Sequence, residues 1–130
     1  MSNGLTIDVD ASALFKMLDQ LGETADAYIK EAAKVTAERI AQEARGRLAR
    51  QTSGTGKTQA AITVTEEEHG ARVFVGRIAG RNPNVPLYLE FGTKFMSARP
   101  FLFASAMLEE GPHMKRVERA LQKAINEASR

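Results

Sequence analysis

The chain has 130 residues, a formal net charge of +2 and an apolar fraction of 43%, which together predict one domain with a modest core. Cysteine is absent, and its absence excludes disulfides, cysteine-based zinc sites and thiol catalysis. The first twenty residues lack a signal-peptide pattern, and no apolar run has the length of a membrane span. We therefore expect a soluble protein that is made in a cytoplasm.

The N-terminal half predicts an extended segment followed by helices. Residues 1–9 end in alternating apolar and polar side chains, which is typical of an extended arm or an edge strand. Asp10 or Ser12 stands where it can cap a following helix. Apolar residues at helical spacing then predict one long helical region that is bent or broken near Gly22, with its main helix over residues 24–48.

The middle of the chain predicts a hairpin between two loops. Residues 50–58 and 78–86 are rich in Gly, Pro, Ser, Thr and Asn, a composition that predicts flexible loops. Between them, β-branched runs predict strands over residues 60–66 and 71–77, and the turn that joins these strands contains Gly70. We therefore predict a small antiparallel sheet built on this hairpin.

The C-terminal third predicts a short extended piece and then helices. Residues 85–93 are apolar and predict the extended piece, and Pro100 is favoured as the first residue of a helix. We expect residues 111–112, a Gly-Pro pair, to end that helix, so that a separate last helix begins near Met114. The whole pattern predicts a single α+β domain over residues 1–130, with the C-terminal helix packed on the sheet.

Residues 53–58 read SGTGKT and invite comparison with a phosphate-binding loop. Such a loop needs a Gly five residues before its Gly-Lys-Thr, but that position is Gln51. It also follows a strand and opens a helix, whereas this segment follows a helical pattern and precedes a strand. The segment is therefore interpreted as a connecting loop, and no nucleotide or other cofactor is expected.

Basic residues gather in two stretches that contain no acid, residues 44–65 and residues 69–89, on either side of three consecutive glutamates. The basic residues are Arg45, Arg47, Arg50 and Lys57 in the first stretch and Arg72, Arg77 and Arg81 in the second. A positive local field attracts phosphates or acidic protein surfaces. An ordinary solvated surface is the alternative interpretation.

One acid, Glu90, lies in the aromatic-rich segment at residues 87–102. General acid–base catalysis needs a second titrating group at a fixed distance, and no such partner lies nearby in the sequence. A structural role fits as well: Glu90 would cap a turn or pair with Arg99 and so hold the loop that carries Gly92. We expect Gly92 to adopt a backbone conformation that other residues resist.

The same segment resembles a family of small proteins of long-tailed, lambda-like bacteriophages, known as tail components or as neck, tail-completion or head–tail joining proteins. The match consists of Tyr88, Leu89, Glu90, Phe91, Gly92 and Thr93, followed by Met96, Ala98, Arg99, Pro100, Phe101 and Leu102. The family often has Thr-Gly-x-Leu before its hairpin, and here Thr58 stands where that Leu is usual. This departure affects the loop and not the fold.

The resemblance implies a structural virion protein that is made in the bacterial host cytoplasm and is not an enzyme. It would join the phage head to the tail, or complete the top of the tail, without a cofactor, a metal, a membrane or a small-molecule substrate. The implied partners are further copies of the chain in a ring, with six-fold symmetry favoured by the tail. Connector or head-completion proteins, and tail-terminator or tail-tube proteins, would lie on either side.

The candidate interface residues are Arg50, Lys57, Arg77, Arg81, Phe95 and Met96. Phe95 and Met96 either are exposed for contacts or belong to the core. The basic residues would face an acidic partner protein or the phosphates of DNA in the channel, where binding is sequence-independent and weakened by salt. A small sequence-independent DNA-binding module is therefore the alternative function.

Overall fold

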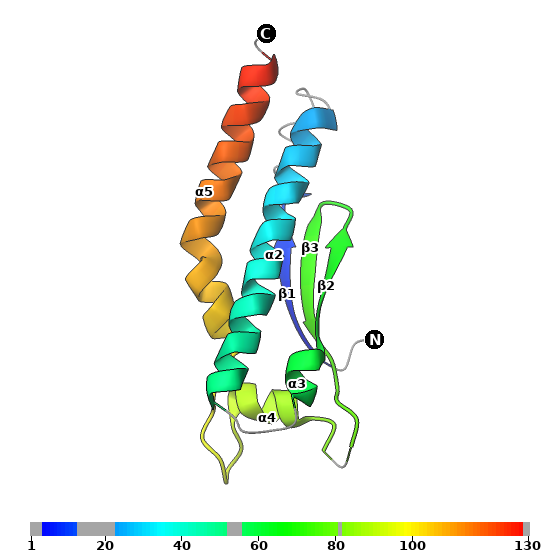
Figure 1. Ribbon diagram of the computed structural model, residues 1–130, viewed down its shortest axis with the longest axis vertical. Helices are drawn as coiled ribbons and strands as arrows, with labels where there is room; N and C mark the ends of the chain where they lie inside the picture. The colour runs from blue at the N-terminus through cyan, green and yellow to red at the C-terminus, as the bar shows by residue number, and fades with distance from the viewer. Residues whose placement is uncertain (1–3, 13–22, 52–55, 81, 129–130) are drawn as a thin grey trace.

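The computed structural model of the chain describes residues 4–12, 23–51, 56–80 and 82–128 (Figure 1). In chain order the elements are β1 (Leu5–Asp10), α2 (Glu23–Gln51), α3 (Lys57–Ala60), β2 (Ile62–Glu67), β3 (Gly70–Val75), α4 (Val85–Phe91) and α5 (Leu102–Ala128). The predicted α+β fold is confirmed. The expected bend or break near Gly22 lies outside the described residues.

The three strands form one antiparallel sheet in the order β1-β3-β2. The predicted hairpin is present, although its strands run over 62–67 and 70–75 and not over 60–66 and 71–77. Residues 5–10 form an edge strand, in agreement with one of the two alternatives for the N-terminal segment. Alternate side chains point to one covered face, and the other face is exposed, as expected for such a sheet.

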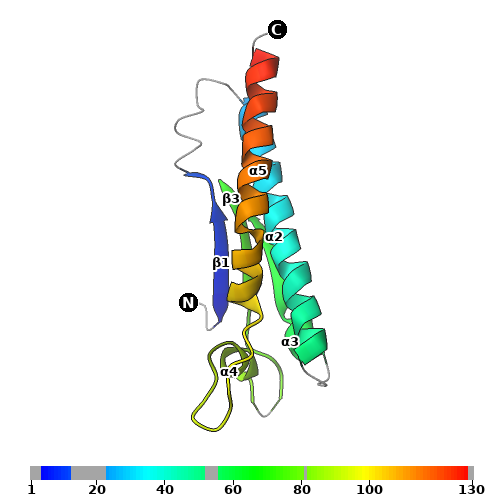
Figure 2. The same cartoon turned by 90° about the vertical axis from the view of Figure 1, so that its left-hand side faces the viewer.

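Helix α2 lies between α5 and the covered face of the sheet (Figures 1 and 2). Its contact face is made largely of alanine, with Ala33, Ala37, Ala41 and Ala44 all buried. Alanine is the best helix former and has a short side chain, so neighbouring elements can approach α2 closely. The main buried cluster joins this face to the sheet and to the start of α5, where Phe101 and Leu102 contribute.

Helix α5 packs along α2, and its N-terminal half also contacts β1. The predicted break at residues 111–112 is wrong, because Pro112 lies inside one continuous helix. Proline removes the hydrogen bond to the carbonyl of Leu108, but this turn is exposed to water, which can bond that carbonyl. Burial of Ser105 before the proline and of Ala124 after it keeps both halves on α2.

The predicted extended piece at residues 85–93 is also wrong, since α4 occupies Val85–Phe91. Pro86 stands in the first helical turn, where its missing N–H costs nothing. Pro86, Leu89 and Glu90 are the buried residues of this helix, and their spacing is helical. The period was overlooked because the helix has only 7 residues.

Both predicted loops are shorter than expected within the described residues. Helix α2 continues to Gln51, and the short helix α3 begins at Lys57, directly after Gly56 at a φ of 82°. The second loop ends where α4 begins, at Val85. Residues 52–55 of the first loop and residue 81 of the second lie outside the described part of the chain.

Candidate functional site

Segments that are far apart in the sequence meet at one end of the molecule, which is the lower end in Figure 1. The end of α2, helix α3, the stretch after β3 and the loop between α4 and α5 all lie there. Hydrogen bonds tie them together: Lys57 Nζ donates to the carbonyl of Ala79 at 3.3 Å, and Arg99 Nη1 donates to the carbonyl of Gln51 at 3.1 Å. We call this region the basic end.

Glu90 closes the first turn of α5. Its Oε1 accepts hydrogen bonds from the backbone N–H groups of Phe101 at 3.1 Å and Leu102 at 2.8 Å, and its Oε2 accepts one from Phe103 at 3.2 Å. A helix N-terminus leaves such N–H groups without partners and carries partial positive charge. The carboxylate, which is only 4% exposed, satisfies both needs at once.

Of the interpretations of Glu90, the geometry matches capping. The suggested pair with Arg99 is absent among the described residues, because Arg99 Nη1 donates to Gln51 and the Arg99 N–H donates to the carbonyl of Leu89 at 2.7 Å. Both carboxylate oxygens of Glu90 already accept hydrogen bonds from the start of α5. The carboxylate therefore positions the start of α5.

Gly92 turns the chain out of α4. Its φ is +75°, in the region that favours glycine, and its N–H donates to the carbonyl of Tyr88 at 2.7 Å. A Cβ at this position would lie 2.8 Å from the Ala98 nitrogen and 2.9 Å from the Met96 oxygen. The expectation of a special backbone conformation at Gly92 is confirmed, and close packing adds a second reason for glycine.

The residues of the family motif divide into a buried and an exposed group. Phe101 and Leu102 are fully buried, whereas Tyr88, Phe91, Thr93, Ala98, Arg99 and Pro100 are exposed. Pro100 is not the first helical residue as predicted, because α5 begins two residues later, at Leu102. The motif therefore builds the corner between α4 and α5 and exposes side chains on its surface.

Phe95 and Met96 behave differently. Phe95 is 88% exposed, with the Lys94 ammonium 4.9 Å from its ring centroid, whereas Met96 is half-buried and packs against the core. A backbone bridge between Thr93 and Met96 closes the loop that carries them. Exposure is thus observed for Phe95, and core packing for Met96. Nearby, the exposed ring of Phe91 lies 5.9 Å from that of Phe103.

Most of the predicted basic residues lie at the basic end, and several are held by specific partners. Arg45 donates to the carbonyl of Ile62 at 2.8 Å, and Arg47 and Arg50 both pair with Glu43. Arg77 is exposed after β3. Arg81 lies outside the described residues.

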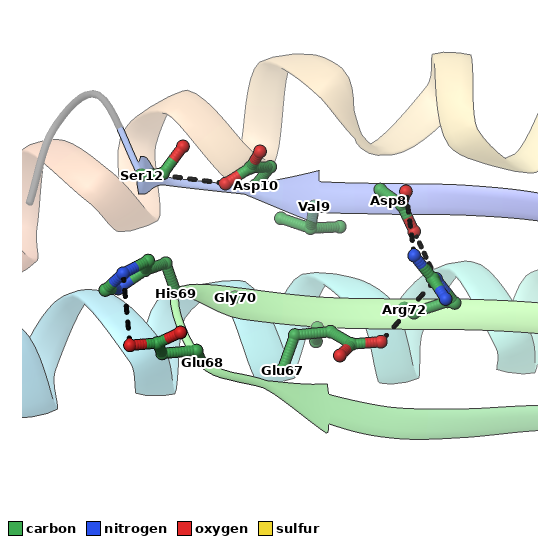
Figure 3. Close-up of a pocket in the computed structure, with 10 residues that line it drawn as sticks. Asp8, Val9, Asp10, Ser12, Glu67, Glu68, His69, Gly70 and Arg72 are labelled. Atoms are coloured by element: carbon green, nitrogen blue, oxygen red, sulfur yellow. Dashed lines mark hydrogen bonds and ion pairs between the residues drawn. The ribbon is translucent and has the colours of Figure 1, made fainter.

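Arg72 does not belong to this group, although it shares a sequence stretch with Arg77. It lies on the exposed face of the sheet, where its Nε is 2.7 Å from Asp8 and 3.5 Å from Glu67 (Figure 3). Asp8 is its direct cross-strand neighbour. The hydrogen bond to Asp8, followed by the charges of Asp8 and Glu67, raises the pKa of Arg72.

A hollow of about 300 Å³ surrounds this ion-pair cluster near the β2–β3 turn. Its polar lining is Asp8, Asp10, Ser12, Glu67, Glu68, His69 and Arg72 (Figure 3). Asp10 caps the N–H of Ser12 at 2.9 Å, and this hydrogen bond lowers the pKa of Asp10. Within the described residues no group of three or more His, Asp or Glu side chains is arranged to hold a metal ion. The Arg72 pairs of this cluster link the three strands of the sheet.

A second hollow, of about 360 Å³, lies between β1 and α5; we call it the β1–α5 groove. At its side, Arg116 Nη1 donates to Thr36 Oγ1 at 2.9 Å, and Thr36 Oγ1 lies 2.6 Å from His113 Nδ1. Arg116 also pairs with Glu109 at 2.8 Å. Burial, and then the charge of Arg116, lowers the pKa of His113, partly opposed by Glu109.

The sequence analysis did not single out this polar network. Thr36 and His113 are 77 positions apart, and no local pattern connects them. The only available signal was the presence of polar residues among the apolar positions of two helices that pack together.

Comparison of the chain with protein-family models, with curated proteins and with solved structures gave no match. Among the described helices, none combines the length and the apolar character needed to span a bilayer.

Proposed function

We propose that this chain is a structural virion protein of a phage or prophage neck, which joins the head to the tail or completes the top of the tail. The observation that carries the proposal is the corner at residues 88–102, the segment that bears the family resemblance. Its one buried acid, Glu90, serves as a helix cap, and its most exposed aromatic residue, Phe95, points to contact with a partner.

In this proposal the protein acts through binding and not through catalysis. Copies of the chain form a closed ring around the path of the DNA, because identical subunits close most readily with cyclic symmetry. Six copies would match the tail, as the family resemblance implies. The basic end and its exposed aromatic residues support such contacts, since aromatic residues, Met and Arg are enriched at protein interfaces.

The ring would bridge a connector or head-completion protein on one side and a tail-terminator or tail-tube protein on the other. Its place is therefore the virion, after synthesis in the cytoplasm of the bacterial host. No cofactor or small-molecule substrate takes part in this function.

The test is the solution mass by light scattering across a concentration series, in low and in moderate salt. We expect a mass that rises with concentration to a fixed multiple of 14.2 kDa. Phe95→Ala should shift this transition to higher concentration. Met114→Ala, which also removes an exposed apolar side chain, serves as the matched control and should leave the transition unchanged. A monomer under all conditions would contradict self-assembly.

A sequence-independent DNA-binding module is the second candidate, and the gathering of cationic side chains at the basic end favours it. Lys57, Arg77 and Lys94 are exposed there. This function predicts duplex binding whose association constant falls steeply with salt, with a linear relation between the logarithms of the constant and of the salt concentration. Fluorescence anisotropy of a labelled duplex over a salt series measures it, and a monomer with a steep slope would favour this candidate over the neck component.

A further inference from the structure

We propose that the β1–α5 groove receives the Lys94–Phe95 tip of a second copy of this chain, so that subunits join head to tail. The inference rests on the proposed function, because it specifies the contact between neighbouring subunits of the ring. It depends on three features of the described residues: a projecting tip with hydrogen bonds at its base, an apolar groove with acidic residues in its lining, and a β1 edge that disfavours pairing with another β1.

The backbone at the base of the tip is fixed by hydrogen bonds. Thr93 N–H donates to the Met96 carbonyl at 2.9 Å, and Phe95 N–H donates to Thr93 Oγ1 at 3.1 Å. Gly92 anchors one side of the loop to α4, and Arg99 anchors the other. On such a base the side chain of Phe95, which is 88% exposed, is the main part of the tip that has to be ordered on binding, which suits an interface anchor.

The groove has an apolar part that suits an aromatic ring. Ile7 and Val9 of β1 line one side, and Ala106 and Met107 of α5 line the other. The Met107 side chain is 73% exposed. Methionine is flexible and makes favourable sulfur–aromatic contacts, so this side chain can pack against an entering ring. The volume of about 360 Å³ is at the low end for small-ligand pockets, and it is sufficient for one aromatic side chain.

The edges of the groove carry negative charge. Four acidic residues are among its lining, Asp8, Asp10, Glu109 and Glu110, and none of its described lining residues is Lys or Arg. Asp8 and Glu109 already pair with arginines outside the groove. Asp10 accepts a hydrogen bond from the Ser12 N–H, so Glu110 is the acid left to attract a cation such as Lys94. The cation and the ring would enter together because Lys94 lies over Phe95.

The outer edge of β1 argues against a strand of the same sheet as the occupant. The bond from Ala11 N–H to the His69 carbonyl sets the alternation, so the backbone groups of Thr6, Asp8 and Asp10 point away from β3. A second β1 would bring these aspartates opposite one another, and the other sheet edge, β2, carries Glu66 and Glu67. Like charges directly opposite one another are destabilising.

The tip and the groove are different surfaces of the chain. The loop with the tip lies below the sheet in Figure 2, whereas β1 and α5 run side by side above it. A contact between different surfaces is heterologous and leaves one tip and one groove free at the ends of every chain of subunits. Such contacts close into a ring when the rotation between subunits allows it.

Two variants that each prevent assembly, when they are mixed, test the contact between tip and groove. Phe95→Asp removes the tip but keeps the groove, and Met107→Lys with Glu110→Lys alters the groove but keeps the tip. Each variant alone should stay monomeric, with a dissociation constant raised about 30-fold or more. An equimolar mixture should form a dimer and nothing larger, because only one intact tip–groove pair remains. Light scattering and native mass spectrometry measure this.

All three positions are exposed, so the thermal midpoints of the variants should match that of the wild-type chain. Met114→Lys, on the same helix but outside the groove lining, is the matched control and should assemble normally. Assembly of either test variant at wild-type concentration overturns the tip–groove contact but leaves the ring. Monomeric variants whose mixture stays monomeric also overturn it. A wild-type chain that is monomeric under all conditions would contradict the proposed ring, and with it the proposed function.

A photo-crosslink gives an independent readout. With p-benzoylphenylalanine at position 95, irradiation of the assembled protein should join that residue to β1 or α5 of another copy. Mass spectrometry of mixed light and heavy isotope-labelled chains identifies the position and shows that the link is between copies. A crosslink to Thr36 or Ile40 of α2, which also line the groove, would agree with it as well, and attachment anywhere else would overturn the assignment of the groove.

Discussion

In two regions of this molecule carboxylates accept hydrogen bonds, but in one region the carboxylate is buried and in the other the carboxylates are exposed. At the corner between α4 and α5, Glu90 is buried and accepts from three backbone N–H groups. On the open face of the sheet, Asp8 and Glu67 hold Arg72, and all three side chains are about half exposed to water. Burial makes a missing partner costly, whereas water screens and replaces an exposed one. The corner should therefore be intolerant of change and the open face tolerant.

The largest effect should come from Glu90→Ala. It would leave the N–H groups of Phe101 and Leu102 without partners in the interior, and we expect a loss of about 3 kcal/mol or more in the free energy of unfolding. Urea unfolding followed by circular dichroism measures it.

Glu90→Gln is the matched variant for the carboxylate. Its side chain keeps one acceptor oxygen but turns an amide NH₂ toward a backbone donor, so we expect an intermediate loss. A wild-type midpoint for Glu90→Ala would show that the cap is not what holds the corner.

The second effect concerns the turn at Gly92. Gly92→Ala would place a Cβ against backbone atoms of Met96 and Ala98 at a positive φ, and we expect a loss of about 2–3 kcal/mol. Gly46→Ala is the control, because its Cβ would meet only the far end of the flexible Arg50 side chain and should be neutral or stabilising. Equal losses for the two variants would contradict a special role for the Gly92 conformation.

The third effect is a dependence of stability on pH that comes from the partly buried His113. His113 has a lowered pKa in the folded chain, so the unfolded chain takes up a proton first when the pH falls below the usual value of 6.5. Stability is then full above that value and declines as the pH falls toward the lowered pKa. Thermal midpoints measured between about pH 7.5 and 5.5 should show this decline, and His113→Gln should flatten it. A slope that persists in the variant would assign the effect to other groups.

The smallest effect should come from the open face. Arg72→Ala removes the cross-strand pair with Asp8, yet both groups are exposed, and we expect little change in the thermal midpoint. Added salt should erase what change remains. A loss as large as that of Glu90→Ala would end the distinction between the two regions.

Sequence patterns by themselves determined the α+β class, the hairpin, the long helix and the special conformation of Gly92, because each depends on neighbouring residues. Tertiary structure decided what local patterns could not. Burial on both sides of Pro112 keeps α5 continuous, and a 7-residue helix replaces the expected extended piece because its buried residues join the core.

Side-chain partners show the same division. Arg72 and Arg77 are only five positions apart but have different surroundings, because Arg72 lies within β3 and Arg77 follows the end of that strand at Val75. The pairing of Thr36 with His113 spans 77 positions and exists only because α2 and α5 pack together. Backbone conformation follows from local sterics, which the sequence carries, whereas partner choice follows from long-range packing, which only the folded chain defines.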